Sequence, residues 1–112
     1  MGTASEMQVY LRLPSKVLFD GPATGLKAEA ADGGFGILPN HVDFVTALVP
    51  SVLLLTQPGG RERFFGIDEG ILMKKGHQVD IAIRRGVQGK DLESLNETIQ
   101  AAFIEVDEEE RV

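Results

Sequence analysis

The chain has 112 residues, the size of one domain, and contains no cysteine, which excludes disulfides, thiolate nucleophiles and cysteine-ligated zinc. The formal net charge of −6 is confined to the last quarter: residues 1–85 carry nine basic and nine acidic side chains, and residues 86–112 carry two and eight. A charge-balanced body with an acidic tail argues against nucleic-acid binding, which needs a basic patch.

The sequence shows no targeting or spanning segment. Residues 1–6 lack the basic and apolar regions of a secretory signal, so we expect none. The most apolar stretch, 44–55, is interrupted by Pro50 and is shorter than the roughly 20 residues that a spanning helix requires. We therefore expect any membrane association to be indirect, through a partner.

Alternating apolar and polar residues predict short strands in the first half of the chain. Val9 and Leu11 alternate with polar neighbours, which is the period of a half-buried strand. A turn at 20–22 is expected to end the second strand, because it combines Asp, Gly and Pro. The strands expected on these grounds are 7–13, 17–19, 26–30, 35–38 and 45–48.

The second half continues the pattern of short strands. The continuous apolar run 52–55 predicts a strand buried on both faces. Pro58-Gly59-Gly60 predicts a hairpin to the next strand. Further strands are expected at 64–67, 71–73 and 79–83. Turn signals every 8–12 residues favour a mainly β fold, either a sandwich or a barrel.

After residue 86 the apolar period changes from two to three or four, which predicts one C-terminal amphipathic α-helix. The apolar positions are Leu92, Leu95, Ile99, Ala102 or Phe103, and Val106. The acidic residues 107–110 leave two interpretations open: a helix cut before its natural end, or a helix that stops near Val106 before a solvated tail. We divide the chain into a β domain, 1–86, and a helical segment, 87–112.

No residue pattern predicts a catalytic, cofactor or metal site. His41 and His77 are the only histidines and have no metal-ligand spacing. The glycine-rich stretch 33–36 leads into an extended Pro-containing segment, whereas a phosphate loop leads into a helix.

The remaining charged pairs are interpreted as structural. Asp68-Glu69 is read as a polar bend, because adjacent carboxylates in a strand point to opposite faces and cannot converge on one substrate. Lys74-Lys75 and Arg84-Arg85 are read as solvated strand ends, which could also meet acidic partner surfaces.

The segment GFGILPNHVDFVTALVPS resembles the signature of the epsilon subunit of F-type ATP synthases. That family shows Gly-x-x-Gly-[Ile/Val]-x-Pro-x-His, then Thr-Ala-[Ile/Leu] and Pro. The matching residues here are Gly33, Gly36, Ile37, Pro39, His41, Thr46, Ala47, Leu48 and Pro50. Residues 65–72 and 79–92 resemble the later strands of the family in the same order, and 40–48 resembles the alternate, sodium-type branch.

The resemblance implies an N-terminal β-sandwich of short antiparallel strands, followed by helices. It implies a non-catalytic rotor component of the central stalk that couples the catalytic core to the ion-conducting ring and regulates ATP hydrolysis. The implied partners are the gamma subunit and the c-ring, with the alpha and beta subunits reached through the C-terminal helix. The implied location is peripheral, on the cytoplasmic face of the bacterial inner membrane.

The motif match also implies a partner interface. His41 and Thr46 match positions near the gamma contact, and the turn Asp32-Gly33-Gly34 with Phe35 matches the loop that reaches the c-ring. The family often has an acid where this chain has Gly34, so Asp32 is the candidate to supply that charge.

The tail departs from the family. A helical hairpin needs roughly forty residues, and 22 follow Lys90, which suffices for the first helix only. Some members bind ATP through Ile-Asp-x-x-Arg-Ala, but residues 92–97 lack the Asp and the Arg. We therefore expect no cofactor, no ATP binding and no strong inhibition of hydrolysis.

A second class of function, a stand-alone β-sandwich module for carbohydrate or peptide, is kept as the alternative. Sugar binding commonly uses exposed aromatic side chains. With no tryptophan, one tyrosine and six phenylalanines, the composition argues against it.

Overall fold

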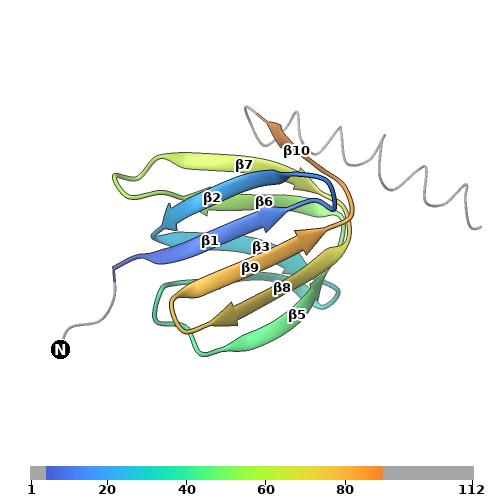
Figure 1. Cartoon of the computed structure of the whole chain (residues 1–112). Coiled ribbons are helices and arrows are strands. Elements are labelled where there is room, and N and C mark those ends of the chain that lie inside the picture. Colours follow the sequence, from blue (N-terminus) through green and yellow to red (C-terminus); the bar gives the residue numbers. More distant parts are fainter. Residues whose placement is uncertain (1–4, 90–112) are drawn as a thin grey trace, which may run out of the picture.

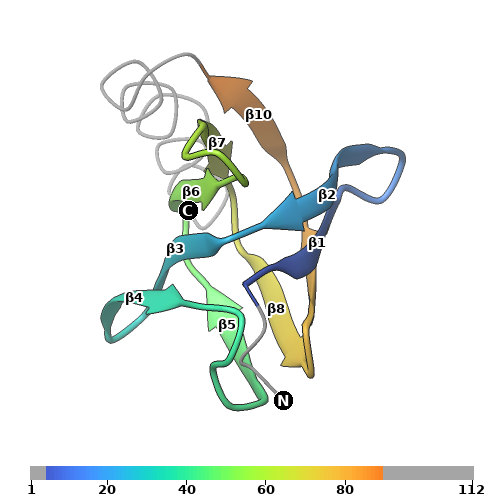
Figure 2. The same cartoon turned by 90° about the vertical axis from the view of Figure 1, so that its left-hand side faces the viewer.

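The computed structural model describes residues 5–89, which form ten strands in two stacked sheets (Figures 1 and 2). The strands are β1 Met7–Arg12, β2 Val17–Ala23, β3 Gly25–Ala30, β4 Gly33–Ile37, β5 Phe44–Leu48, β6 Ser51–Thr56, β7 Glu62–Ile67, β8 Gly70–Lys75, β9 Gln78–Ile83 and β10 Gly86–Gly89. The predicted mainly β sandwich is therefore confirmed for this part of the chain. The predicted C-terminal helix lies outside the described residues.

The first sheet has the strand order β2-β1-β9-β8-β5, and the second has β10-β7-β6-β3-β4. All pairs are antiparallel except β1 with β9, which is parallel, whereas only antiparallel pairs were expected. The strands β5 and β4 end the two sheets on the same side, and β2 and β10 end them on the other (Figure 1).

The core lies between the sheets, where the inward residues of each strand interdigitate. Val9 and Leu11 of β1 face this layer with no exposed surface, as their alternation predicts. Phe19 of β2 meets Phe65 of β7 edge to face across the layer, with ring centroids 6.2 Å apart. This contact joins the two sheets on the side of β2 and β7.

The hairpin predicted at Pro58-Gly59-Gly60 is present between β6 and β7. Gln57 accepts from the amide of Gly60 and donates to the carbonyl of Arg61, and the positive φ angles of Gly59 (92°) and Gly60 (87°) suit glycine.

Further features of the strands differ from what the sequence predicts. The turn expected at 20–22 is instead part of β2, which continues to Ala23. Pro22 is tolerated there because β2 is an edge strand, so its missing amide breaks no ladder bond. The run 52–55 has one fully buried face, with Leu53 and Leu55, and one partly exposed face, with Val52 and Leu54. Strand β10 was not expected, and it pairs with β7.

Candidate partner-binding surface

The six residues predicted for the partner interface all lie along one edge of the sandwich, formed by β4, β5 and the segments beside them (Figure 2). The six residues are Asp32, Gly33, Gly34, Phe35, His41 and Thr46. We call residues 32–48 the β4–β5 edge. The two sheets are tied here by the amide of Val49, which donates to the carbonyl of Glu29 over 3.2 Å.

Phe35 and His41 are brought together by Phe44, a residue that the sequence analysis did not name. The rings of Phe35 and Phe44 meet edge to face at 5.8 Å, and the ring of His41 lies 4.9 Å from that of Phe44. Phe35 and Phe44 also pack against the core. The signal for Phe44 was present, since it alternates with Thr46 and Leu48 on the inward face of β5.

His41 lies in the loop between β4 and β5 and is exposed. Its Nδ1 is 2.8 Å from the carbonyl oxygen of Val42, which requires a proton on Nδ1 and leaves Nε2 for a partner. Leu38 and Val42 of the same loop expose 67 % and 74 % of their surface. A loop that exposes two apolar side chains among polar neighbours suits a protein partner.

The other predicted residues are placed apart from His41. Thr46 is half-buried on the inward face of β5, opposite Leu72, and its hydroxyl lies 3.4 Å from the carbonyl oxygen of Ala47. Asp32, Gly33 and Gly34 are exposed at the opposite end of β4. Gly33 has a φ of 127°, which only glycine adopts readily, so this turn depends on it.

An apolar stripe on the outer face of the first sheet was missed by sequence reasoning. Val45 of β5 pairs with Met73 of β8, and Ala47 pairs with Ile71. Val45, Ile71 and Met73 expose 61 %, 56 % and 45 % of their surface. These four residues, which we call the β5–β8 stripe, extend the apolar surface of the edge. The alternation of β8 contained the signal, because Ile71 and Met73 flank the buried Leu72.

The outer face of the second sheet carries a groove of about 690 Å³ beside the edge. Gly34 and Gly36 of β4 leave it open because they have no side chains, and Leu54 and Phe64 supply apolar walls. Lys27 stands beside these walls from β3.

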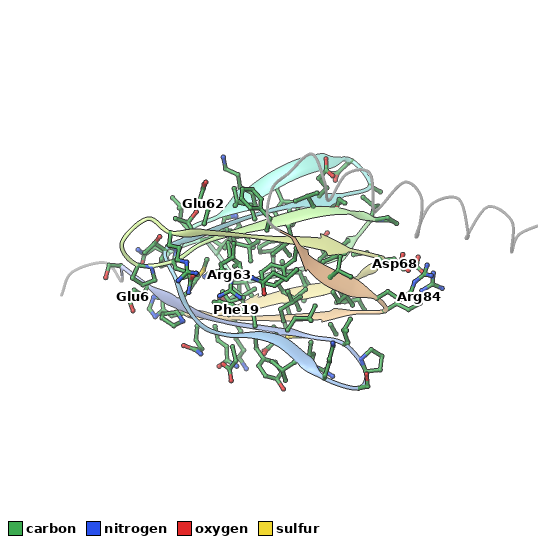
Figure 3. The ribbon with its side chains drawn as sticks, turned by 90° about the horizontal axis from the view of Figure 1, so that it is seen from above. Glu6, Phe19, Glu62, Arg63, Asp68 and Arg84 are labelled. Carbon is green, nitrogen blue, oxygen red and sulfur yellow. The ribbon has the colours of Figure 1, made fainter. Side chains whose placement is uncertain are left out.

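Asp68-Glu69 forms the predicted polar bend, between β7 and β8, but Asp68 is buried and paired, which was not expected. Its side chain has no exposed surface, and its Oδ2 accepts from Nε and Nη2 of Arg84 (3.0 and 2.9 Å) and from Nε of Arg85 (2.8 Å). Figure 3 shows Asp68 and Arg84 side by side at one end of the sandwich. Burial alone raises the pKa of Asp68, but the hydrogen bonds from the Glu69 amide, Arg85 and Arg84 outweigh burial and hold this pKa below its usual 3.8.

The basic pairs are only partly the solvated strand ends that were expected: Lys75 and Arg84 are exposed, and Lys74 is buried. Arg84 and Arg85 hold Asp68, so the β7–β8 bend is tied to the β9–β10 bend. Lys74 is only 2 % exposed, whereas its neighbour Lys75 is exposed, as expected for a solvated lysine. The burial of Asp68 and Lys74 could not be predicted from the sequence. The partners of Asp68 are distant in the chain, and those of Lys74 are backbone carbonyl groups.

Within residues 5–89 no group of three metal-ligating side chains comes together, and no helix there is long and apolar enough to cross a membrane. The positions compared with the ATP motif, 92–97, lie outside the described residues.

The family model for the β-sandwich domain of the ATP synthase delta/epsilon chain matches residues 6–89, which include all ten strands described above. The chain belongs to this family. It is 38 % identical over 98 residues to the ATP synthase epsilon chain 2 of Paraburkholderia xenovorans, covering 86 % of this chain and 70 % of that relative. It is 40 % identical over 80 residues to the epsilon chain 2 of Cereibacter sphaeroides, covering 70 % and 55 %.

Solved structures show the same fold. A chain in the Euglena gracilis mitochondrial ATP synthase (OSCP/F1/c-ring, rotational state 1) matches with a TM-score of 0.74 at 20 % identity, covering 89 % of this chain and 65 % of that chain. A chain in the central stalk/c-ring of the Tetrahymena thermophila enzyme matches with a TM-score of 0.62 at 15 % identity, covering 78 % and 69 %. The matches of this epsilon-family chain thus cover between 55 % and 70 % of the length of these relatives.

Proposed function

We propose that this chain is the epsilon subunit of a membrane ATP synthase, a rotor component of the central stalk that joins the gamma subunit to the c-ring and regulates ATP hydrolysis without a catalytic site of its own. The observation that carries this proposal is the family match over residues 6–89. The similar chains are named epsilon chains, and the structures with this fold include central stalk and c-ring assemblies. These comparisons give no support to the carbohydrate- or peptide-binding alternative.

The exposed apolar surface supports a gamma contact on the β4–β5 edge and the β5–β8 stripe. Leu38, Val42 and Val45 would be covered by a partner, and His41 would direct its Nε2 toward it. Phe35 packs against the core and Thr46 lies on the inward face of β5, so both would support this surface from its inner side. The turn with Asp32, Gly33 and Gly34, at the other end of β4, would face the c-ring.

The subunit would be peripheral, on the cytoplasmic face of the bacterial inner membrane, and its body would be the domain 1–86. Within the segment 87–112, residues 87–89 belong to β10, so its one helix would follow Gly89 and would reach the alpha and beta subunits. The sodium-type branch and the absence of ATP binding stay predictions; calorimetric titration with MgATP tests the latter, and micromolar affinity would contradict it.

The function is tested by mixing the full chain with its cognate gamma subunit and separating the mixture by gel filtration. We expect one complex that elutes before either protein alone and that retains purified c-ring in a pull-down. Separate elution of chain and gamma at micromolar concentrations would overturn the proposal.

A further inference from the structure

Lys74 places an ammonium group where the strand pattern calls for an apolar side chain. It follows Leu72 on the inward face of β8, and both residues are buried. An unbranched apolar residue would fill this position without the cost of removing a charge from water. The lysine therefore needs a specific compensating role.

Two backbone carbonyl groups hold the ammonium. Nζ of Lys74 donates to the carbonyl oxygens of His41 and Gly76, each over 2.6 Å. Within residues 5–89 no carboxylate lies within ion-pair distance of Nζ. The ammonium group of Lys74 thus makes charge-assisted hydrogen bonds to the loop that carries His41 and to the turn that carries Gly76.

A second contact joins the same two loops. The amide of Gly76, in the β8–β9 turn, donates to Oδ1 of Asp43 over 2.8 Å. Gly76 has a φ of 59°, which favours glycine at this turn. Lys74 and Asp43 together therefore fasten the 38–43 loop to the turn between β8 and β9.

We propose that Lys74 is a positioning residue, which fixes the carbonyl of His41 and thereby holds the exposed 38–43 loop in the conformation that its protein partner binds. This inference rests on the proposed function, because that function makes the loop an interface. The loop needs such support: residues 38–43 belong to no strand, and Val42 is 74 % exposed. A loop that is ordered before binding loses less conformational entropy on binding.

The first test is amide hydrogen exchange on the full chain with Lys74→Met. Lys75→Met is the matched control, because Lys75 is the exposed neighbour on the same strand. We expect exchange at His41 and Gly76 to accelerate about tenfold or more in Lys74→Met. Exchange at the core amides of Leu53 and Ile81 should change little, and Lys74→Arg should restore most of the protection. Unchanged exchange at His41, or equal acceleration throughout the sandwich, would overturn the proposal.

Asp43→Ala keeps the inference testable if Lys74→Met does not fold, because Asp43 is exposed and its removal leaves the core intact. It should accelerate exchange at the same amides to a smaller extent, and unchanged exchange there would count against the proposal.

The second test measures binding to the cognate gamma subunit. Lys74→Met should bind about tenfold more weakly than Lys75→Met, and Lys74→Arg should recover the affinity. Accelerated loop exchange with unchanged affinity would overturn the positioning role and leave the proposed function intact. If the unaltered chain itself does not bind gamma, the proposed function fails, and exchange alone then decides whether Lys74 fixes the loop.

Discussion

The buried carboxylate of Asp68 accepts two hydrogen bonds from the guanidinium of Arg84, although 16 positions separate the two residues in the sequence. Arg85 adds a third bond to the same oxygen, Oδ2. The arrangement ties the bend between β7 and β8 to the bend between β9 and β10, where the chain crosses from the first sheet to the second. Asp68 therefore stabilises the connection from β9 to β10, which is the last crossing between the two sheets.

Replacing Asp68 by Asn should lower the free energy of unfolding by about 2–3 kcal/mol, because both guanidiniums lose their anion. The value is below that of a fully buried pair, since the side chains of Arg84 and Arg85 are 46 % and 37 % exposed. Urea denaturation of the full chain measures it. Glu69→Gln is the control and should change stability by less than about 0.5 kcal/mol, because its contact with Arg84 is 3.7 Å long and exposed. Equal effects of both substitutions would contradict this assignment.

Asp68 should also make stability depend on pH. Its pKa is lowered in the folded protein, so the unfolded chain binds its proton first as the pH falls. The stabilisation is present above the unfolded value of about 3.8 and is lost as the pH falls toward the folded pKa. The stability difference between the unaltered chain and Asp68→Asn should therefore be constant near neutral pH and shrink below about pH 4. A difference that grows on acidification would refute the depressed pKa.

Gly70 should tolerate no side chain. A Cβ at this position would lie 2.4 Å from the carbonyl oxygen of Ala82 and 2.7 Å from Cγ2 of Ile83. Gly70→Ala should destabilise the chain by at least about 2 kcal/mol through overpacking. Gly36→Ala is the matched control, since its Cβ would meet the nearest atom, the carbonyl oxygen of Leu26, at an ordinary 3.7 Å. Thermal unfolding distinguishes them, and similar melting temperatures for the two variants would be the contrary result.

Arg63 should contribute to holding the two sheets together on the side of β2. Its guanidinium carbon lies 5.4 Å from the ring centre of Phe19 and 5.7 Å from that of Phe65, and Nη2 donates to Gln88 of β10 over 2.9 Å. Figure 3 shows Arg63 and Phe19 close together. Arg63→Met should lower the free energy of unfolding by about 1–2 kcal/mol. Arg61→Met, in the exposed hairpin, should leave it almost unchanged. A loss from Arg61→Met as large as that from Arg63→Met would contradict this role.

The strands could be predicted because local pattern decides them. Val9 and Leu11 alternate, and Pro58-Gly59-Gly60 combines the fixed φ of proline with the positive φ angles that glycine adopts readily in a turn. The continuation of β2 through Pro22 could not be predicted, because a strand tolerates proline only at an edge, and strand order is a property of the whole fold.

The same distinction holds for the candidate interface. The motif match selected residues that the fold gathers along one edge, because they are close in sequence. It missed the β5–β8 stripe, since Val45 and Met73 meet only through cross-strand pairing. It also missed Lys74, whose acceptors are backbone carbonyls that carry no sequence signal.

The central claim is that the exposed apolar surface around β5 binds the gamma subunit, and a matched pair of substitutions tests it most directly. Val45 and Val17 are both exposed valines on edge strands, at 61 % and 47 %, but they lie on opposite edges of the first sheet. Each is replaced by Asp in the full chain, and the dissociation constant for the cognate gamma subunit is measured by calorimetry. We predict that Val45→Asp weakens binding at least about tenfold through burial of an unpaired charge, and that Val17→Asp leaves it unchanged. Equal affinities of the two variants would contradict the assignment of this surface.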